Sequence, residues 1–244
     1  MLLKAGRLER AVQVAERAID TSLALGDEVG AIPAIRVVLG VAWRRGDLQV
    51  LRARAEQALA IETRHDLGLY MALGSYWMAA IAVIEGNTTS AMRQVDAALR
   101  RRGIIAVRQA LQALRSLLLR RMGRADQAWH ELMQIVPHGT RILGAVNVTG
   151  PIERGWCELE LGRLDEARSS FDEAAGALWA ARDPQWVAAS LEGQAAAALR
   201  CDAPQEAGQL LSRADAIRLD APAVFNLHSV EVDQLRQGLR GRQR

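Results

Sequence analysis

A six-residue pattern that begins with glycine recurs along the chain at nearly equal steps. The clear copies are Gly6-Arg-Leu-Glu-Arg-Ala11, Gly123-Arg-Ala-Asp-Gln-Ala128 and Gly162-Arg-Leu-Asp-Glu-Ala167. The weaker copies are Gly46-Asp-Leu-Gln-Val-Leu51, Gly86-Asn-Thr-Thr-Ser-Ala91 and Asp202-Ala-Pro-Gln-Glu-Ala207. Their starts are separated by 40, 40, 37, 39 and 40 residues. A nearly constant period of this length indicates a repeat architecture, in which one supersecondary unit is stacked many times.

The pattern has the chemistry of a turn between two helices. Glycine tolerates the left-handed backbone that ends a helix, and the small alanine lets the paired helices approach closely. Apolar stretches precede the turns and amphipathic stretches follow them; in 164–178 the apolar residues recur at helical spacing. We therefore predict an all-α protein of about twelve helices, arranged as a right-handed superhelical solenoid of about six helix pairs. No Ser/Gly-rich linker interrupts it, which predicts a single domain over residues 1–244.

Helix breakers separate the predicted pairs. They are Gly26-Asp27, His65-Asp66, Gly103, Pro137-His138-Gly139, Asp183-Pro184 and Asp220-Ala-Pro222. Pro33 and Pro184 suit the first turn of a helix, where a missing N–H costs nothing. The turn at Gly6 follows hardly any helix, so we expect the N-terminus to be truncated relative to a full array. Such an uncapped end is a candidate for homo-oligomer contacts, and residues 240–244 are expected to form a disordered tail.

The charge and its distribution along the chain indicate which compartment and which class of partner to expect. The net charge is +3 over 244 residues, an excess that calls for no polyanionic partner. The first residues carry charge without a long apolar run, so they do not form a secretory signal, and we expect a cytoplasmic protein. The uncharged stretch Leu67–Ile84 has 18 positions but contains two glycines and no flanking basic cluster, which favours a buried repeat helix over a membrane span.

The repeat resembles the tetratricopeptide repeat, at a period nearer 40 residues than 34. Lengthened repeats of this kind are similar to the helical sensor regions of large bacterial transcriptional regulators, both the LuxR type with an ATPase module and the type with a bacterial transcriptional activator domain. The stretches that carry this resemblance are 178–193 (LWAARDPQWVAASLEG) and 206–218 (EAGQLLSRADAIR), followed by Ala221-Pro222. The chain lacks a GxxxxGK[ST] loop and a convincing helix-turn-helix reader. The resemblance therefore implies a sensing arm without the ATPase and DNA-binding parts.

The sequence offers no catalytic, cofactor-binding or metal-binding set. No two of His65, His130, His138 and His228 lie four positions apart, and Cys157 and Cys201 form no CxxC motif. Nothing similar to GxSxG marks a nucleophile. Acidic pairs such as Asp165/Glu166 and Asp172/Glu173 are explained by the solvated face of a helix. We therefore expect no enzyme activity, no metal and no cofactor.

In tetratricopeptide arrays the first helix of each pair lines a concave groove. Alignment on the turn glycine places six residues near that face: Arg36, Trp43, Tyr76, Arg120, Trp156 and Glu160. A mixture of aromatic residues and arginines is typical of protein-binding hot spots. We predict that this groove binds a protein or peptide partner.

An alternative is a nucleic-acid-binding repeat protein that uses the arginine clusters. These are Arg100-Arg101-Arg102 and the tail residues Arg236, Arg240, Arg242 and Arg244. Helix-end charge or a disordered tail explains the same residues, and no aromatic residues interleave with them for base stacking. We therefore expect no direct contact with nucleic acid.

Overall fold

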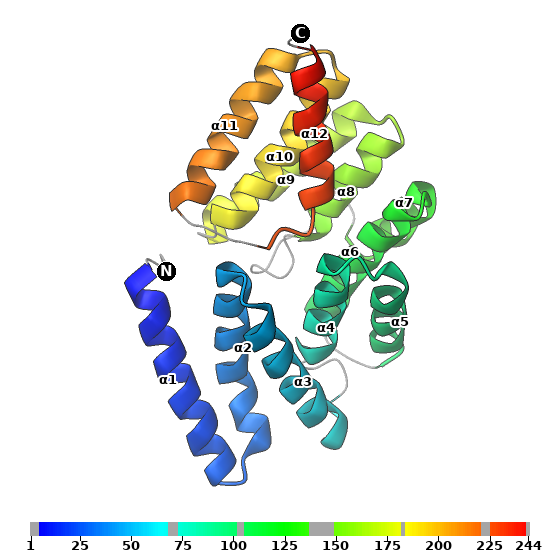
Figure 1. Ribbon diagram of the computed structural model, residues 1–244. Helices are drawn as coiled ribbons and strands as arrows, with labels where there is room; N and C mark the ends of the chain where they lie inside the picture. The colour runs from blue at the N-terminus through cyan, green and yellow to red at the C-terminus, as the bar shows by residue number, and fades with distance from the viewer. Residues whose placement is uncertain are drawn as a thin grey trace. The chain divides into compact units, whose positions relative to one another are not determined.

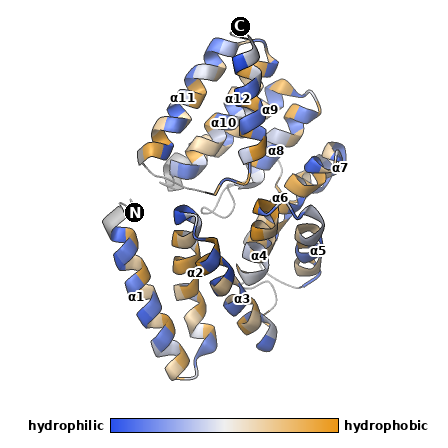
Figure 2. Ribbon diagram, viewed as in Figure 1, coloured by the Kyte–Doolittle hydropathy of each residue, from blue (hydrophilic) through white to orange (hydrophobic). Residues whose placement is uncertain are grey.

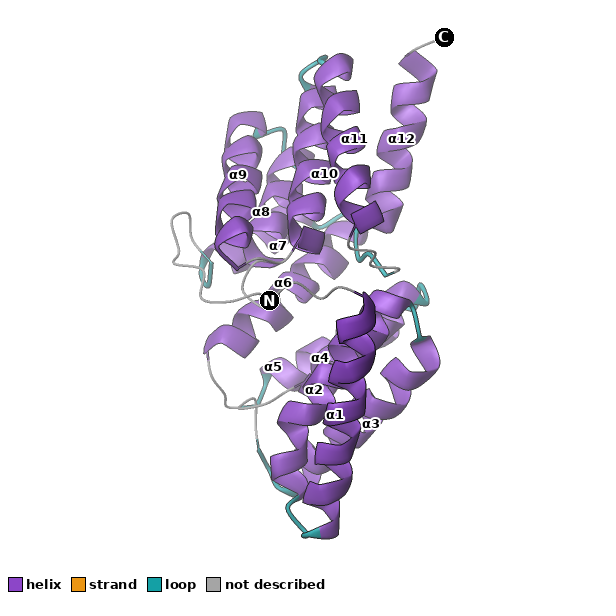
Figure 3. Ribbon diagram, turned by 90° about the vertical axis from the view of Figure 1, so that its left-hand side faces the viewer, coloured by secondary structure: helices purple, strands orange, loops and turns teal. Residues whose placement is uncertain are grey.

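The described residues form α-helices joined by short turns. The computed structural model describes residues 5–67, 73–101, 105–136, 149–181, 184–220 and 225–242. Within these ranges there are twelve helices and no strand (Figures 1 and 3). The helices are α1 (Ala5–Ala24), α2 (Glu28–Arg45), α3 (Leu48–Arg64), α4 (Leu73–Ile84), α5 (Thr88–Leu99), α6 (Ile105–Arg121), α7 (Ala125–Met133), α8 (Thr149–Glu160), α9 (Leu164–Ala181), α10 (Pro184–Arg200), α11 (Pro204–Asp220) and α12 (Ser229–Arg242). The all-α prediction is confirmed for these residues.

The chain divides into two compact units. Unit 1 comprises residues 1–111 and 223–225, and unit 2 comprises residues 112–222 and 226–244, so the boundary falls inside α6. In unit 1 consecutive helices from α1 to α5 pack against one another, and in unit 2 the same holds from α7 to α11. Packing between sequence neighbours is what a repeat of helix, turn and helix predicts.

One type of turn ends seven of the helices in the described residues. In the turn after α2, Gly46 has a φ of 70° and its amide donates to the carbonyl of Trp43 at 3.3 Å, while the amide of Asp47 donates to Ala42 at 3.0 Å. These two bonds are the Schellman arrangement, which satisfies the last carbonyls of a helix. The Asp47 carboxylate then accepts from the amide of Val50 at 3.0 Å and caps α3.

The left-handed residue of each turn has a φ between 46° and 74°. These residues are Gly26, Gly46, Asp66, Gly86, Gly123, Gly162 and Asp202. The turns predicted at 46, 86, 123, 162 and 202 are therefore confirmed, and the breakers at Gly26 and Asp66 form the same turn. Aspartate takes the place of glycine twice, because its short polar side chain tolerates this region better than most residues.

Two local predictions are wrong. Gly6 lies inside α1, which begins at Ala5, so no helix ends at this glycine and no left-handed backbone is needed. Pro33 lies in the sixth position of α2 rather than in its first turn, because Asp27 caps that helix by accepting from the amide of Gly30 at 2.9 Å. Pro184 does begin α10, as predicted.

Four of the predicted helix breakers lie outside the described residues: Gly103, 137–139, Asp183 and 221–222. α12 continues through residues 240–242 of the expected tail.

No helix in the described part of the chain is both long and apolar enough to cross a membrane. Within the uncharged stretch Leu67–Ile84, residues 73–84 form α4, whose buried face includes Ala79, Ala80 and Ile81.

The core of unit 2 is organised around Phe171 in α9. This ring is fully buried and contacts Trp156 of α8 edge-on, with centroids 5.7 Å apart. Two glycines make room for it, since a Cβ added at Gly155 would lie 2.7 Å from the ring and one added at Gly193 would lie closer still. The close approach of α8, α9 and α10 therefore depends on one large side chain facing two glycines.

We predict that Gly193→Ala destabilises unit 2 by about 1–2 kcal/mol, because the new methyl group would overpack a ring that cannot move away. Gly208→Ala in α11 is the matched control. A Cβ there meets nothing within 4 Å, so alanine should stabilise the helix by about 0.5–1 kcal/mol. Urea unfolding followed by circular dichroism measures both. Equal stability of the two variants would contradict the packing described.

Candidate functional site

The structure brings three of the six predicted groove residues together. Arg120 at the end of α6 pairs with Glu160 at the end of α8, with Nη1 to Oε1 at 2.7 Å. The Arg120 guanidinium lies over the Trp156 ring, 5.5 Å from its centroid. Arg120 and Trp156 are only 4% and 6% exposed. These two side chains are therefore covered by other parts of unit 2.

The other three predicted residues lie in unit 1. Trp43 is buried against Trp77, with ring centroids 5.2 Å apart, and Tyr76 contacts the same Trp77 ring edge-on at 5.5 Å. Phe225, which belongs to unit 1, lies 5.4 Å from Trp43. Arg36 is exposed on α2, beside the exposed Val37. Trp43 thus contributes mainly to packing, whereas Arg36 is open to solvent.

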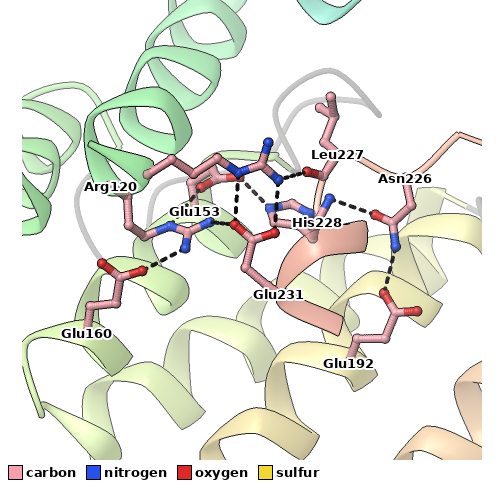
Figure 4. A network of polar contacts seen from close by, with 9 residues as sticks. Arg120, Glu153, Glu160, Glu192, Asn226, Leu227, His228 and Glu231 are labelled. Carbon is pink, nitrogen blue, oxygen red and sulfur yellow. Dashed lines mark hydrogen bonds and ion pairs between the residues drawn. The ribbon is translucent and has the colours of Figure 1, made fainter. Parts of the chain in front are cut away.

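Arg120 is the centre of a buried charge cluster, which we call the Arg120 cluster (Figure 4). Its members are Arg120, Arg121, Glu153, Glu160, His228 and Glu231. Besides Glu160, Arg120 binds Glu231 of α12 through Nη2 at 2.7 Å, and its Nε lies 3.8 Å from Glu153. Burial lowers the pKa of Arg120, but the three carboxylates outweigh it and raise the pKa above its usual value. Arg120 therefore remains a cation inside the unit.

Glu231 binds both arginines at once. Arg121 donates to Glu231 from Nε at 3.1 Å and from Nη2 at 2.9 Å, a bidentate pairing. The same Nη2 donates to the carbonyl of Leu227 at 2.5 Å. Burial raises the pKa of Glu231, but the bonds from Arg121 and the charge of Arg120 outweigh it and lower the pKa to about 2. Glu231 therefore stays ionised well below the pH at which an unpaired carboxylate titrates.

His228 extends the cluster to α8. Its Nε2 contacts Glu153, and its ring stacks on Trp156 with an interplanar angle of 16°. The backbone amide of His228 donates to the side chain of Asn226 at 3.0 Å, and Asn226 in turn donates to Glu192 of α10 at 3.2 Å. Figure 4 shows this chain of contacts from the start of α12 to α6, α8 and α10. The residues before and at the start of α12 therefore bind three other helices.

A second buried cluster joins α8 to α9. Arg154 is fully buried and donates to Ser170 at 2.9 Å and to the carbonyl of Val136 at 3.0 Å. Its third partner is Glu173, and Ser170 donates to Glu158 at 2.6 Å. Because each of these groups has a protein partner, the cluster acts as internal structure rather than as a reactive site.

In both clusters the positively charged and negatively charged side chains neutralise one another. Burial raises the pKa of the Cys157 thiol well above its usual range, so this cysteine is a poor nucleophile. In the described part of the chain no group of three His, Cys, Asp or Glu residues could hold a metal ion. His138 lies outside the described residues. Of the acidic pairs, Asp165 and Glu166 are exposed in the first turn of α9.

Sequence reasoning found Arg120 and Glu160 but missed the other members of the Arg120 cluster. Glu153 was detectable, because it precedes Trp156 by three residues and Glu160 by seven, which places all three on one helix face. Arg121, His228 and Glu231 carried no comparable signal. His228 and Glu231 lie more than 100 residues beyond Arg120, in and just before a helix that no turn glycine precedes.

Comparison with known proteins supports the fold. No family model matches the chain, and no curated protein matches it by sequence. Among solved structures, the crystal structure of BtubC (BKLC) from P. vanneervenii is similar, with a TM-score of 0.53. The match covers 90% of this chain and 94% of that one, at 14% sequence identity. At this identity the likeness concerns the fold alone.

We predict that Glu231→Gln destabilises unit 2 by about 3–5 kcal/mol at neutral pH, since two arginines lose a buried counter-charge. The folded-state pKa of Glu231 is lowered from 4.5 to about 2. The stability it contributes is therefore complete above pH 4.5 and is lost as the pH falls towards 2. Unfolding free energies of both proteins, measured across this range, should converge in acid.

Asp233→Asn, at an exposed position of α12, is the control for the loss of a carboxylate from this helix. Its unfolding free energy should stay close to that of the wild type at neutral pH. A constant gap between wild type and Glu231→Gln throughout the acid range would contradict the role assigned to Glu231.

Proposed function

We propose that this chain is a tetratricopeptide-like solenoid of about six helix pairs that binds a protein or peptide partner and has no enzymatic activity. We further propose that it is the sensor or adaptor arm of a bacterial transcriptional regulator and acts in the cytoplasm. The proposal draws its regulatory part from the resemblance of 178–193 and 206–218 to such sensor regions. The observation that carries the binding function is the recurrence of one left-handed turn within the predicted pairs, at Gly46, Gly86, Gly123, Gly162 and Asp202, which lie 37 to 40 residues apart.

A stack of helix pairs supports binding because it presents a long surface that no single pair could form. The ionisable groups of unit 2, in contrast, are directed at one another. Arg120, Glu231 and Arg154 each bind charged partners inside the unit. A catalytic group needs a free reacting side, and these contacts leave little of one.

The exposed side of α2 is the part of the predicted groove that a partner can reach directly. Arg36 and Val37 are both exposed there, and Val37 is 42% exposed. An exposed arginine next to an exposed apolar residue is more typical of a protein interface than of a helix face that only contacts water. This surface belongs to unit 1 and needs no rearrangement of unit 2.

The nucleic-acid alternative receives less support. Arg236 binds Asp215 of α11 through Nη2 at 2.5 Å, so its charge is neutralised within unit 2. Two further members of the arginine clusters, Arg102 and Arg244, lie outside the described residues. Binding to duplex or single-stranded nucleic acid that weakens steeply with salt would revive this alternative.

We predict that a photo-crosslinking amino acid at position 36 captures a specific protein when the full chain is expressed in its own cells. The same amino acid at Arg93, an exposed position of α5 on the second helix of a pair, is the matched control. Mass spectrometry should identify a product that forms at position 36 and not at 93. For a regulator arm, the captured protein or the same polypeptide should carry a DNA-binding or nucleotide-binding domain.

Two results would count against the proposal. Equal crosslinking from positions 36 and 93 would mean that α2 presents no specific binding surface. A captured partner without any link to transcription would retain the binding function but remove the regulatory role.

A further inference from the structure

α12 packs against α10 and α11 in unit 2, and its start lies where three of the predicted groove residues meet. Its start binds Arg120 and Arg121 of α6 and, through His228, Glu153 of α8. Further along, Arg236 binds Asp215 of α11, and Leu235 and Leu239 join the core of α8–α11. Figure 1 shows α12 running alongside α10 and α11. The chain itself therefore covers Arg120 and Trp156.

Few apolar side chains hold α12 against the rest of unit 2. Its buried apolar residues in the described part are Val232, Leu235 and Leu239, each 6% exposed. Most of the other residues of α12 are hydrophilic (Figure 2), and Val230 is 51% exposed. By comparison, α10 buries eight apolar residues. Gly238 and Gly241 lower the intrinsic helix stability further. A helix with few buried contacts opens more readily than the core around it.

The polar attachment of α12 is strong and specific. Glu231 lies in the first turn of the helix and faces two arginine side chains. Without that carboxylate, Arg121 would lose its bidentate partner, and Arg120 would keep only Glu153 and Glu160 against its buried charge. A partner that displaces α12 would therefore have to supply a carboxylate in place of that of Glu231. It would also uncover Trp156, which gives the surface the aromatic and arginine content of a binding hot spot.

We propose that α12, with residues 226–228 before it, is an intramolecular occupant of a helix-binding face on unit 2. The partner that displaces it is an amphipathic helix with a carboxylate in its first turn and apolar residues one, four and eight positions later. This is the spacing of Glu231 to Val232, Leu235 and Leu239. The proposal rests on the proposed function in one respect, that the partner is a protein.

The experiment supplies α12 in trans. A labelled peptide of residues 226–242 is titrated into the full chain by fluorescence anisotropy, using wild type and the variants Glu231→Gln and Asp233→Asn. In the Glu231→Gln chain the internal helix loses its anchor, so the peptide should bind about tenfold or more tightly than to wild type. The Asp233→Asn chain should behave as wild type. A peptide with Gln at position 231 should bind none of them measurably.

Hydrogen exchange on the wild-type chain is the second measurement, and it is informative even if Glu231→Gln unfolds unit 2. Amides of α12 should exchange faster than those of α8 and α10 under native conditions. Exchange of α12 only together with α10 would overturn the proposal, because the helix would then be part of the core. Equal peptide affinity for wild type and a folded Glu231→Gln chain would overturn it as well.

A third result would reassign the occupant. If isotope-labelled and unlabelled chains exchange α12 within a dimer, the helix belongs to a second copy and the intramolecular proposal fails. None of these outcomes depends on the photo-crosslinking at position 36, which reports on unit 1 and tests the proposed function independently.

Discussion

The left-handed residue that ends seven of the twelve described helices is the constraint on which the rest of the structure depends. A helix leaves its last four carbonyls without partners. The Schellman bonds at Gly46 satisfy two of them and reverse the chain direction within a few residues. Because the same geometry recurs at seven positions, neighbouring helices meet side by side, and each can bury an apolar face only against the next. The turns at Gly162 and Asp202 set α8 against α9 and α10 against α11 in this way.

The Arg120 cluster illustrates what charge adds to an otherwise apolar core. Burying ions costs more than it returns unless every charge finds a well-placed partner. Arg120 meets this condition through its two Nη atoms, which bind Glu160 and Glu231, while its Nε faces Glu153 at 3.8 Å, beyond hydrogen-bond distance. The buried apolar contacts of α12 are not directional. The bidentate pairing of Arg121 with Glu231 is directional, so charge fixes the start of this helix more narrowly than apolar burial alone does.

Local signals in the sequence predicted the turns and part of the site. The left-handed backbone is a property of single residues, so the glycines revealed it, and regular spacing revealed Asp202 where the glycine is missing. Arg120 and Glu160 were predicted together because they precede Gly123 and Gly162 by three and two residues, which gives them nearly the same register in successive pairs. The partners in α12 could not be found in this way. Their contacts join residues 110 or more positions apart and depend on how a helix without a preceding glycine turn is placed.

Two of the left-handed turns have aspartate in place of glycine, so the turns of this chain differ in backbone free energy. Asp66 and Asp202 hold left-handed φ angles of 46° and 58°, which cost a residue with a Cβ about 1 kcal/mol or more relative to glycine. The five glycine turns carry no such cost. The turns after α3 and between α10 and α11 are therefore the two at which backbone conformation opposes the fold, so the packing of the helices on either side has to offset that cost.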